Sequence, residues 1–194
     1  MKYLIPSLGQ FLIAMICKFP KDMEQHITQI GDIIIHLLGT EVRMEAVAMQ
    51  IASALFERIG LTSDDFVKKV LFQIFTTMHF YRNNTKNKVI PIAITKAILI
   101  FFSTFMINFG EEKLLALCDT IQPGILFMIL KSEGDKIKFC SAPPRDRKYA
   151  ICAFTNLVCN KASSFLEDSL KTVVGSLIEL SSKTSANTGF QMAS

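Results

Sequence analysis

The chain has 194 residues, of which half are hydrophobic and a fifth are charged. Glycine and proline number only 9 and 6. This composition excludes collagen, linker and disordered chains, which lack the apolar side chains that offset the entropy of ordering. The formal net charge of +4 does not by itself indicate a nucleic-acid-binding protein. Five unevenly spaced cysteines are typical of a reducing compartment and not of a secreted disulfide framework.

Apolar residues recur at steps of three and four along most of the chain, which predicts helices. No run of alternating residues predicts a strand, so we expect an all-α fold. The expected helices lie at about residues 3–19, 22–38, 41–59, 64–81, 88–108, 111–131, 146–160 and 164–182.

Local signals mark the ends of the first helices. Pro20 ends the first helix, and Gly39 suits the left-handed position after the second. Gly60 ends the third helix. The stretch at residues 62–65 (Thr-Ser-Asp-Asp) then predicts an N-cap followed by acidic residues that complement the dipole of the fourth helix. A polar loop is expected from Arg82 to Asn87.

The segment 89–109 is almost entirely apolar and is long enough to span a bilayer. Lys96 lies inside it and would cost about 2.5–3.5 kcal/mol near the centre of a membrane. A helix that is apolar on most sides is also what a core position requires when other helices flank it. We therefore expect a core helix and no membrane span.

Further features are predicted in the second half of the chain. Pro123 is expected to kink the sixth helix, because proline removes a backbone hydrogen bond and its ring clashes with the preceding turn. The segment 131–145 is expected to be a loop. Ser164 and Glu167 have the spacing of a capping box for the last helix. Residues 183–194 are small and polar, which predicts a flexible tail or a linker to further repeats.

Pairing neighbouring helices gives four hairpins, at about residues 3–38, 41–81, 88–131 and 146–182. Two helices in each unit of about 40–47 residues are typical of HEAT or armadillo repeats, whose stacked hairpins share one continuous core. We therefore expect residues 1–182 to form an α-solenoid of about four HEAT-type hairpins. A globular helical bundle is the alternative.

The sequence contains few residue patterns that are typical of enzyme active sites. The three histidines lie far apart, and no glycine-rich phosphate loop, nucleophile elbow or paired-carboxylate pattern is present. Cys152 and Cys159 are seven residues apart, as two small core residues of one helix face would be, and do not form a zinc-binding pair. We expect no enzyme activity, cofactor or metal, and a function in protein binding by a helical surface.

Basic residues form two local clusters, and no Asp or Glu occurs between Phe66 and Gly110. Such a stretch can attract an acidic partner, although a solvated loop has the same composition. A nucleic-acid-binding solenoid would need a basic stripe repeated in every hairpin, so we do not expect nucleic-acid binding. The candidate partner-binding residues are Arg82, Lys86, Lys88, Lys136, Lys138, Arg145, Arg147 and Lys148.

Several segments of the chain resemble the CAS-type exportins of the importin-β superfamily, the receptors that re-export importin-α. In that family a Phe-rich helix end precedes an Ile-Gln-Pro turn and a Met-hydrophobic-Leu run. The matching segments are residues 101–108 (FFSTFMIN), Asp119-x-Ile121-Gln122-Pro123, Met128-Ile129-Leu130, 150–153 (AICA) before Leu157, 188–191 (TGFQ), Ile5-Pro6-x-Leu8 and Leu12-x-Ala14. The segment 131–144 departs from the family, where a more apolar helix continues.

The resemblance implies an internal piece from the C-terminal part of a much longer export receptor. It also implies binding of importin-α together with Ran-GTP in the nucleus and release in the cytoplasm, so that the protein shuttles between both compartments. Most Ran contacts would lie in N-terminal repeats outside this piece, which would end before the last repeat. A generic HEAT-repeat scaffold, or another karyopherin with different protein partners, is the alternative.

Overall fold

The computed structural model describes residues 4–40, 42–60, 63–84 and 89–183. Within these ranges the chain is helical and contains no strand, which confirms the all-α prediction. The helices are α1 (Leu4–Lys18), α2 (Pro20–Glu24), α3 (Ile27–Leu37), α4 (Val42–Arg58), α5 (Asp64–Asn84), α6 (Ile92–Phe109), α7 (Glu111–Asp119), α8 (Ile125–Glu133), α9 (Pro144–Lys161) and α10 (Glu167–Ser182). Two short 3-10 helices, Gly134–Phe139 and Ala162–Ser164, precede α9 and α10.

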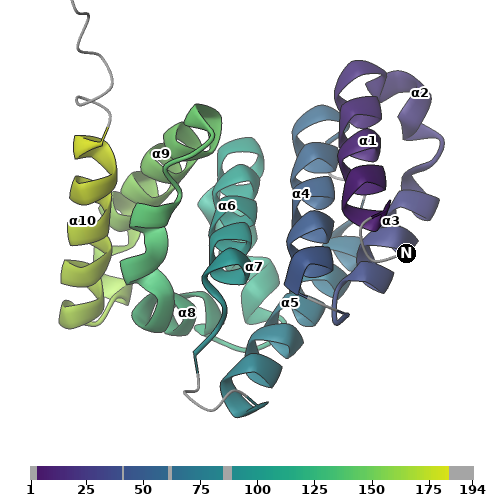
Figure 1. Cartoon of the computed structure of the whole chain (residues 1–194). Helices are drawn as coiled ribbons and strands as arrows, with labels where there is room; N and C mark the ends of the chain where they lie inside the picture. Colours follow the sequence, from purple (N-terminus) through teal and green to yellow (C-terminus); the bar gives the residue numbers. More distant parts are fainter. Residues whose placement is uncertain (1–3, 41, 61–62, 85–88, 184–194) are drawn as a thin grey trace, which may run out of the picture.

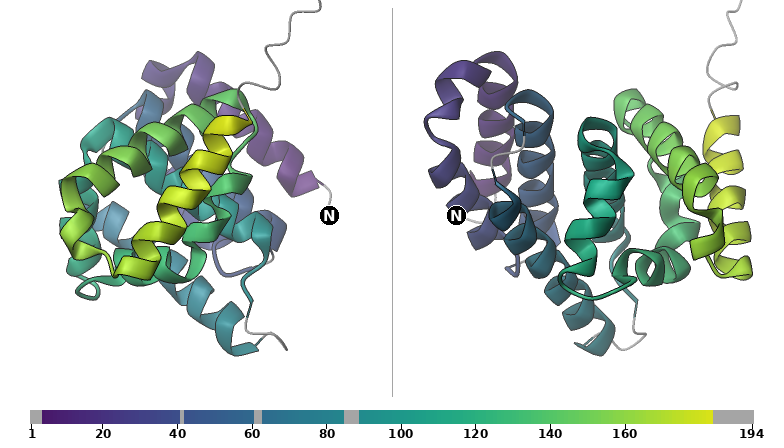
Figure 2. Two further views of the ribbon diagram at one scale, coloured as in Figure 1. Left: turned by 90° about the vertical axis from the view of Figure 1, so that its left-hand side faces the viewer. Right: turned by 180° about the vertical axis from the view of Figure 1, so that it is seen from behind.

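The helices form two rows that run through the molecule. In one row α1 packs on α4, α4 on α6 and α6 on α9. In the other, α3 packs on α5, α5 on α7, α7 on α8 and α8 on α10. The helices follow one another in chain order from α1 at one end to α10 at the other (Figure 1). Seen from that second end, α10 lies across the front of the molecule (Figure 2, left). This is a HEAT-like solenoid and not a closed bundle.

Two glycines allow close contact within the rows. Gly9 of α1 lies against Val47 of α4, where an added Cβ would collide with the valine side chain. Gly31 of α3 is buried against Phe66 of α5, whose ring would be 2.9 Å from such a Cβ. Each glycine therefore lets two helices of one row approach more closely than a larger residue would.

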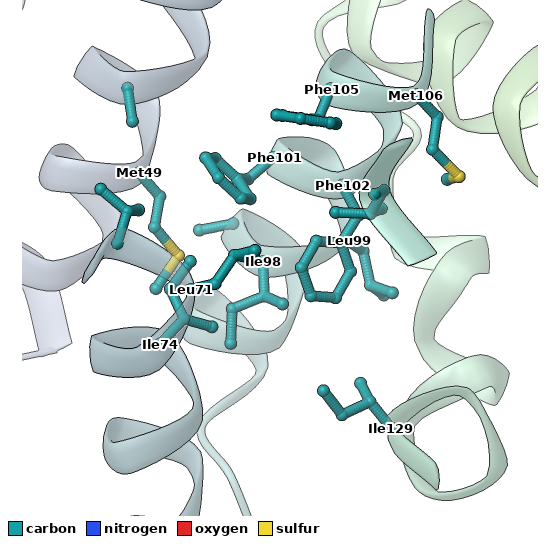
Figure 3. Close-up of a cluster of buried hydrophobic side chains, with 14 of the residues drawn as sticks. Met49, Leu71, Ile74, Ile98, Leu99, Phe101, Phe102, Phe105, Met106 and Ile129 are labelled. Atoms are coloured by element: carbon teal, nitrogen blue, oxygen red, sulfur yellow. The ribbon is translucent and has the colours of Figure 1, made fainter. Parts of the chain in front are cut away.

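Helix α6 lies at the centre of the core. Met49 of α4, together with Leu71 and Ile74 of α5, reaches toward one side of it, and Ile129 of α8 lies on the other (Figure 3). Among the described helices, α6 is the one that is long and apolar enough to cross a membrane, and 67% of it is buried inside the protein. Its apolar surroundings within the protein account for its composition.

The predicted helix 22–38 is wrong as a single element. Pro20 does not only end α1 but also begins α2, because proline at the first helical position needs no N–H partner there. Helix α2 stops at Glu24 and contributes no buried side chain. Helix α3 then begins at Ile27 and carries the apolar stripe.

The predicted kink at Pro123 is also wrong, because the helix ends before the proline. Helix α7 stops at Asp119, and Gly124 takes a φ of +72° that favours glycine. The Asp119 carboxylate accepts a hydrogen bond of 2.8 Å from the Gly124 N–H. This contact closes the turn from which α8 starts at Ile125.

The predicted loop at 131–145 and the predicted capping box are corrected as well. The segment after Glu133 is a 3-10 helix that packs on α10, and Ile137 and Cys140 are fully buried. At α10 no side chain caps the first turn, and Leu166 takes the N-cap position. Phe165 is buried against Phe127, with ring centroids 4.9 Å apart, so packing rather than capping defines this helix start.

Other local predictions agree with the structure or are refined by it. Ser63 caps α5, since its hydroxyl accepts a 3.1 Å hydrogen bond from the Phe66 N–H. Helix α5 continues to Asn84, so Arg82 is helical and does not lie in a loop. Cys152 and Cys159 are exposed, which corrects the expectation that they occupy the core. Except for Lys183, the predicted tail at 183–194 lies outside the described residues.

Candidate partner-binding surface

Two of the predicted basic residues meet at a buried carboxylate. Glu133, at the end of α8, is only 4% exposed. Arg82 of α5 donates a 3.1 Å hydrogen bond to its Oε1, and Lys136 of the first 3-10 helix pairs with Oε2. The Thr95 hydroxyl of α6 donates to the same Oε2 at 3.3 Å. Glu133 thus connects the end of α8 to α5, α6 and the first 3-10 helix.

Removing this carboxylate should weaken the solenoid. We expect Glu133→Ala to lower the free energy of unfolding by about 2 kcal/mol, because Lys136 and Thr95 lose their shared acceptor in a largely buried place. Urea denaturation followed by circular dichroism measures the change. The matched control is Glu167→Ala, which breaks the exposed pair with Lys171 and should cost less than about 0.5 kcal/mol. Equal effects of both variants would contradict a structural role for Glu133.

Arg145 forms a second connection, between α9 and α4. Its guanidinium donates a 3.0 Å hydrogen bond to Glu57 Oε2, and it also pairs with Asp146 at 3.2 Å. The Tyr149 hydroxyl donates to Glu57 Oε1 at 3.2 Å. Burial alone would lower the pKa of Arg145, but Glu57 and Asp146 outweigh it and raise that pKa. Burial and the Glu57 charge raise the pKa of Tyr149.

Arg145 also lines a groove of about 440 Å³ beside α1, α4 and α6. Its polar lining includes Gln50 and Ser53 of α4 and Asp146 of α9. Lys96 of α6 donates a 2.8 Å hydrogen bond across the groove to the Ala142 carbonyl. The two cationic side chains that line the groove, Lys96 and Arg145, therefore already form hydrogen bonds within the protein.

The remaining predicted residues lie apart from these two networks. Lys138 pairs with Glu179 of α10 at 3.4 Å and lies 5.6 Å from the centroid of the Phe139 ring. Arg147 and Lys148 lie in the first turns of α9 and form no ion pair within the described part of the chain. Lys86 and Lys88 fall outside the described residues.

Sequence reasoning missed the buried acids that organise these contacts. Glu45 of α4 is 3% exposed and accepts hydrogen bonds from the Gly39 N–H at 3.2 Å and the Tyr81 hydroxyl at 2.8 Å. Burial, together with the bond to Glu45, raises the pKa of Tyr81. A lone acid among apolar residues of a helical stripe is the signal that could have identified Glu45. Glu133 carries no such signal, because its partners come from distant segments.

The thiol groups of the two buried cysteines have low reactivity. Burial raises the pKa values of Cys118 and Cys140 to about 12, which suppresses the nucleophilic thiolate. Among the residues that the structure describes, no group of three or more His, Cys, Asp or Glu side chains could hold a metal ion.

Comparison with known families identifies the chain. A family model described as the C-terminus of the CAS/CSE protein matches residues 2–191. The chain belongs to the CAS/CSE family. No curated protein and no solved structure matches it. The family match confirms the resemblance to CAS-type exportins and makes the CAS/CSE chain a segment of a karyopherin-type transport receptor. Receptors of this class move between the nucleus and the cytoplasm.

Proposed function

We propose that this CAS/CSE chain forms part of an export receptor that binds importin-α together with Ran-GTP and returns importin-α to the cytoplasm. The family match over residues 2–191 carries the proposal. The solenoid supports it, since stacked helix pairs offer an extended surface for a protein partner. Ran-GTP is bound mainly by repeats outside this chain.

The mechanism depends on the curvature of the solenoid. Small rotations between successive helix pairs add up along two continuous rows, so a solenoid has open and closed forms of similar energy. Importin-α and Ran-GTP each stabilise the closed form. Their binding is therefore coupled, and hydrolysis of GTP releases both.

The six predicted basic residues that the structure describes divide into two groups in this proposal. Arg82, Lys136, Lys138 and Arg145 form ion pairs that join helices and therefore set the shape of the surface. Arg147 and Lys148 are the described members with unengaged charge, so they are the candidates for direct contact with an acidic partner.

The test uses the receptor as it occurs in cells, captured from nuclear extract by an antibody raised against this chain. Importin-α should be retained with GTP-loaded Ran about tenfold more strongly than with GDP-loaded Ran, within the range usual for coupled ligands. Equal retention in both states would overturn the proposal. Capture of a different protein without importin-α would favour the generic scaffold.

Charge-reversal variants distinguish residues that contact importin-α from residues that only stabilise the fold. Arg147→Glu with Lys148→Glu, made in the receptor, should weaken retention of importin-α several-fold while leaving thermal stability unchanged. The matched control reverses two exposed lysines in the first helices, Lys18 and Lys21. Unchanged retention in both double variants would exclude the α9 residues from the contact.

A further inference from the structure

A second groove, between α5 and the α7–α8 segment, has the composition of a peptide-binding site. We propose that it binds an acidic amphipathic helix from a protein partner, with the apolar face of that helix in the groove and its acidic residues beside Lys68 and Lys69. This inference does not depend on the partners proposed above.

The groove has an apolar floor and exposed apolar walls. Its volume is about 410 Å³. Phe75 and Met78 of α5, with Ile125 and Ile129 of α8, are buried and form the floor. The walls are exposed: Phe72 of α5 is 59% exposed and Met128 of α8 is 50% exposed. Large side chains on both rims of an apolar groove are typical of a protein-interaction site.

A shallower pocket extends the groove toward the start of α5. Phe72 and Ile121 line both pockets, and Lys68, Lys69 and Thr120 line the extension. Neither lysine forms an ion pair within the described part of the chain.

The charge of this surface selects the partner. No Asp or Glu lines either pocket, whereas Lys68, Lys69, His79 and Arg82 do. Arg82 is already held by Glu133, so the unengaged positive charge lies at the Lys68 end. Three carboxylates lie near these pockets along the chain: Asp119 is bonded to the Gly124 N–H and Asp64 is paired with Lys113, while Asp65 lies in the first turn of α5, one turn before Lys68 and Lys69. An acidic segment therefore meets complementary charge at one end of the groove.

The shape of the groove favours a helix as the bound form. The wall runs along α5 from Lys68 to Arg82, a length of about 21 Å at 1.5 Å per residue. That length accommodates about four helical turns. An amphipathic helix that places residues i, i+3, i+4 and i+7 into an apolar groove is a common mode of peptide recognition.

The experiment measures binding of a designed peptide to the 194-residue chain by fluorescence anisotropy. The probe is a helical peptide of about four turns with Leu and Phe on one stripe and a cluster of Glu at one end. A peptide of the same composition in scrambled order is the reference. We expect the amphipathic peptide to bind at least about tenfold more tightly, and its affinity to fall as salt increases.

Variants assign the binding to the groove. Phe72→Ala, and separately Lys68→Glu with Lys69→Glu, should each weaken binding about tenfold, as loss of an anchor or of charge complementarity does. The matched control is Ile178→Ala on α10, which removes an equally exposed apolar side chain elsewhere and should change nothing. Equal affinity for the scrambled peptide, or unchanged binding by the groove variants, would overturn the proposal. Tighter binding of phosphatidylserine vesicles or of RNA, weakened by the same variants, would also overturn it.

Discussion

A Leu55→Asp variant should fail to adopt the native helical structure. Leu55 is 0% exposed in α4, the helix that packs on α1, α3 and α6. An unpaired carboxylate at this position costs upwards of about 4 kcal/mol, a large part of the roughly 5–15 kcal/mol that stabilises an ordinary domain. We expect the far-ultraviolet circular dichroism signal to lose its cooperative thermal transition.

The control for Leu55→Asp is the same substitution at Leu8 of α1, which is 55% exposed. There the carboxylate stays hydrated, so the transition should persist with a change of less than about 1 kcal/mol. A cooperative transition in Leu55→Asp that matches the unsubstituted chain would show that α4 is not part of a shared core.

The second large effect is expected from Phe101→Ala. Phe101 belongs to α6, is fully buried, and has ring centroids 5.6 Å from that of Phe56 and 6.0 Å from that of Phe102. It lies among the side chains between α6 and its neighbours (Figure 3). Truncation should cost about 3–5 kcal/mol, because it removes both the burial of the ring and its aromatic contacts. Denaturant unfolding measures this loss as a lower midpoint.

Phe72→Ala is the matched control for Phe101→Ala, since the same residue type is truncated on the exposed wall of the groove in α5. The free energy of unfolding should change by less than about 0.5 kcal/mol. A loss as large as that of Phe101→Ala would mean that Phe72 is a packing residue, and peptide binding would then need another explanation.

The helical class and most helix positions could be predicted from the sequence, because local signals control them. The apolar stripes identified the long helices, and Gly39, Gly60 and Gly110 take the positive φ values that suit helix ends. Residues 131–145 were predicted less well. The charged residues of this segment obscure the burial of Ile137 and Cys140, which lie in or just after a 3-10 helix that packs on α10, α6 and α8. The capping box at Ser164 failed for a similar reason, since the burial of Phe165 displaces the helix start.

At the candidate surface, the contacts of the basic residues could not be predicted from local sequence either. Their positions are evident in the sequence, but their roles depend on acids that are distant in the chain. Arg82 and Glu133 are separated by 51 residues, and Arg145 and Glu57 by 88. No local pattern relates residues so far apart, because only the tertiary packing brings α5 near the end of α8 and α9 near α4.

By itself, then, the sequence determined that the chain is all-helical and resembles the CAS-type exportins. Helical periodicity and family motifs could be recognised because both depend on residues that are close together in the chain. Only the tertiary structure decided which charges are engaged and which remain available to a partner. The same holds for the apolar groove between α5 and α8, because its walls come from helices more than 40 residues apart that meet only when the second row of the solenoid is assembled.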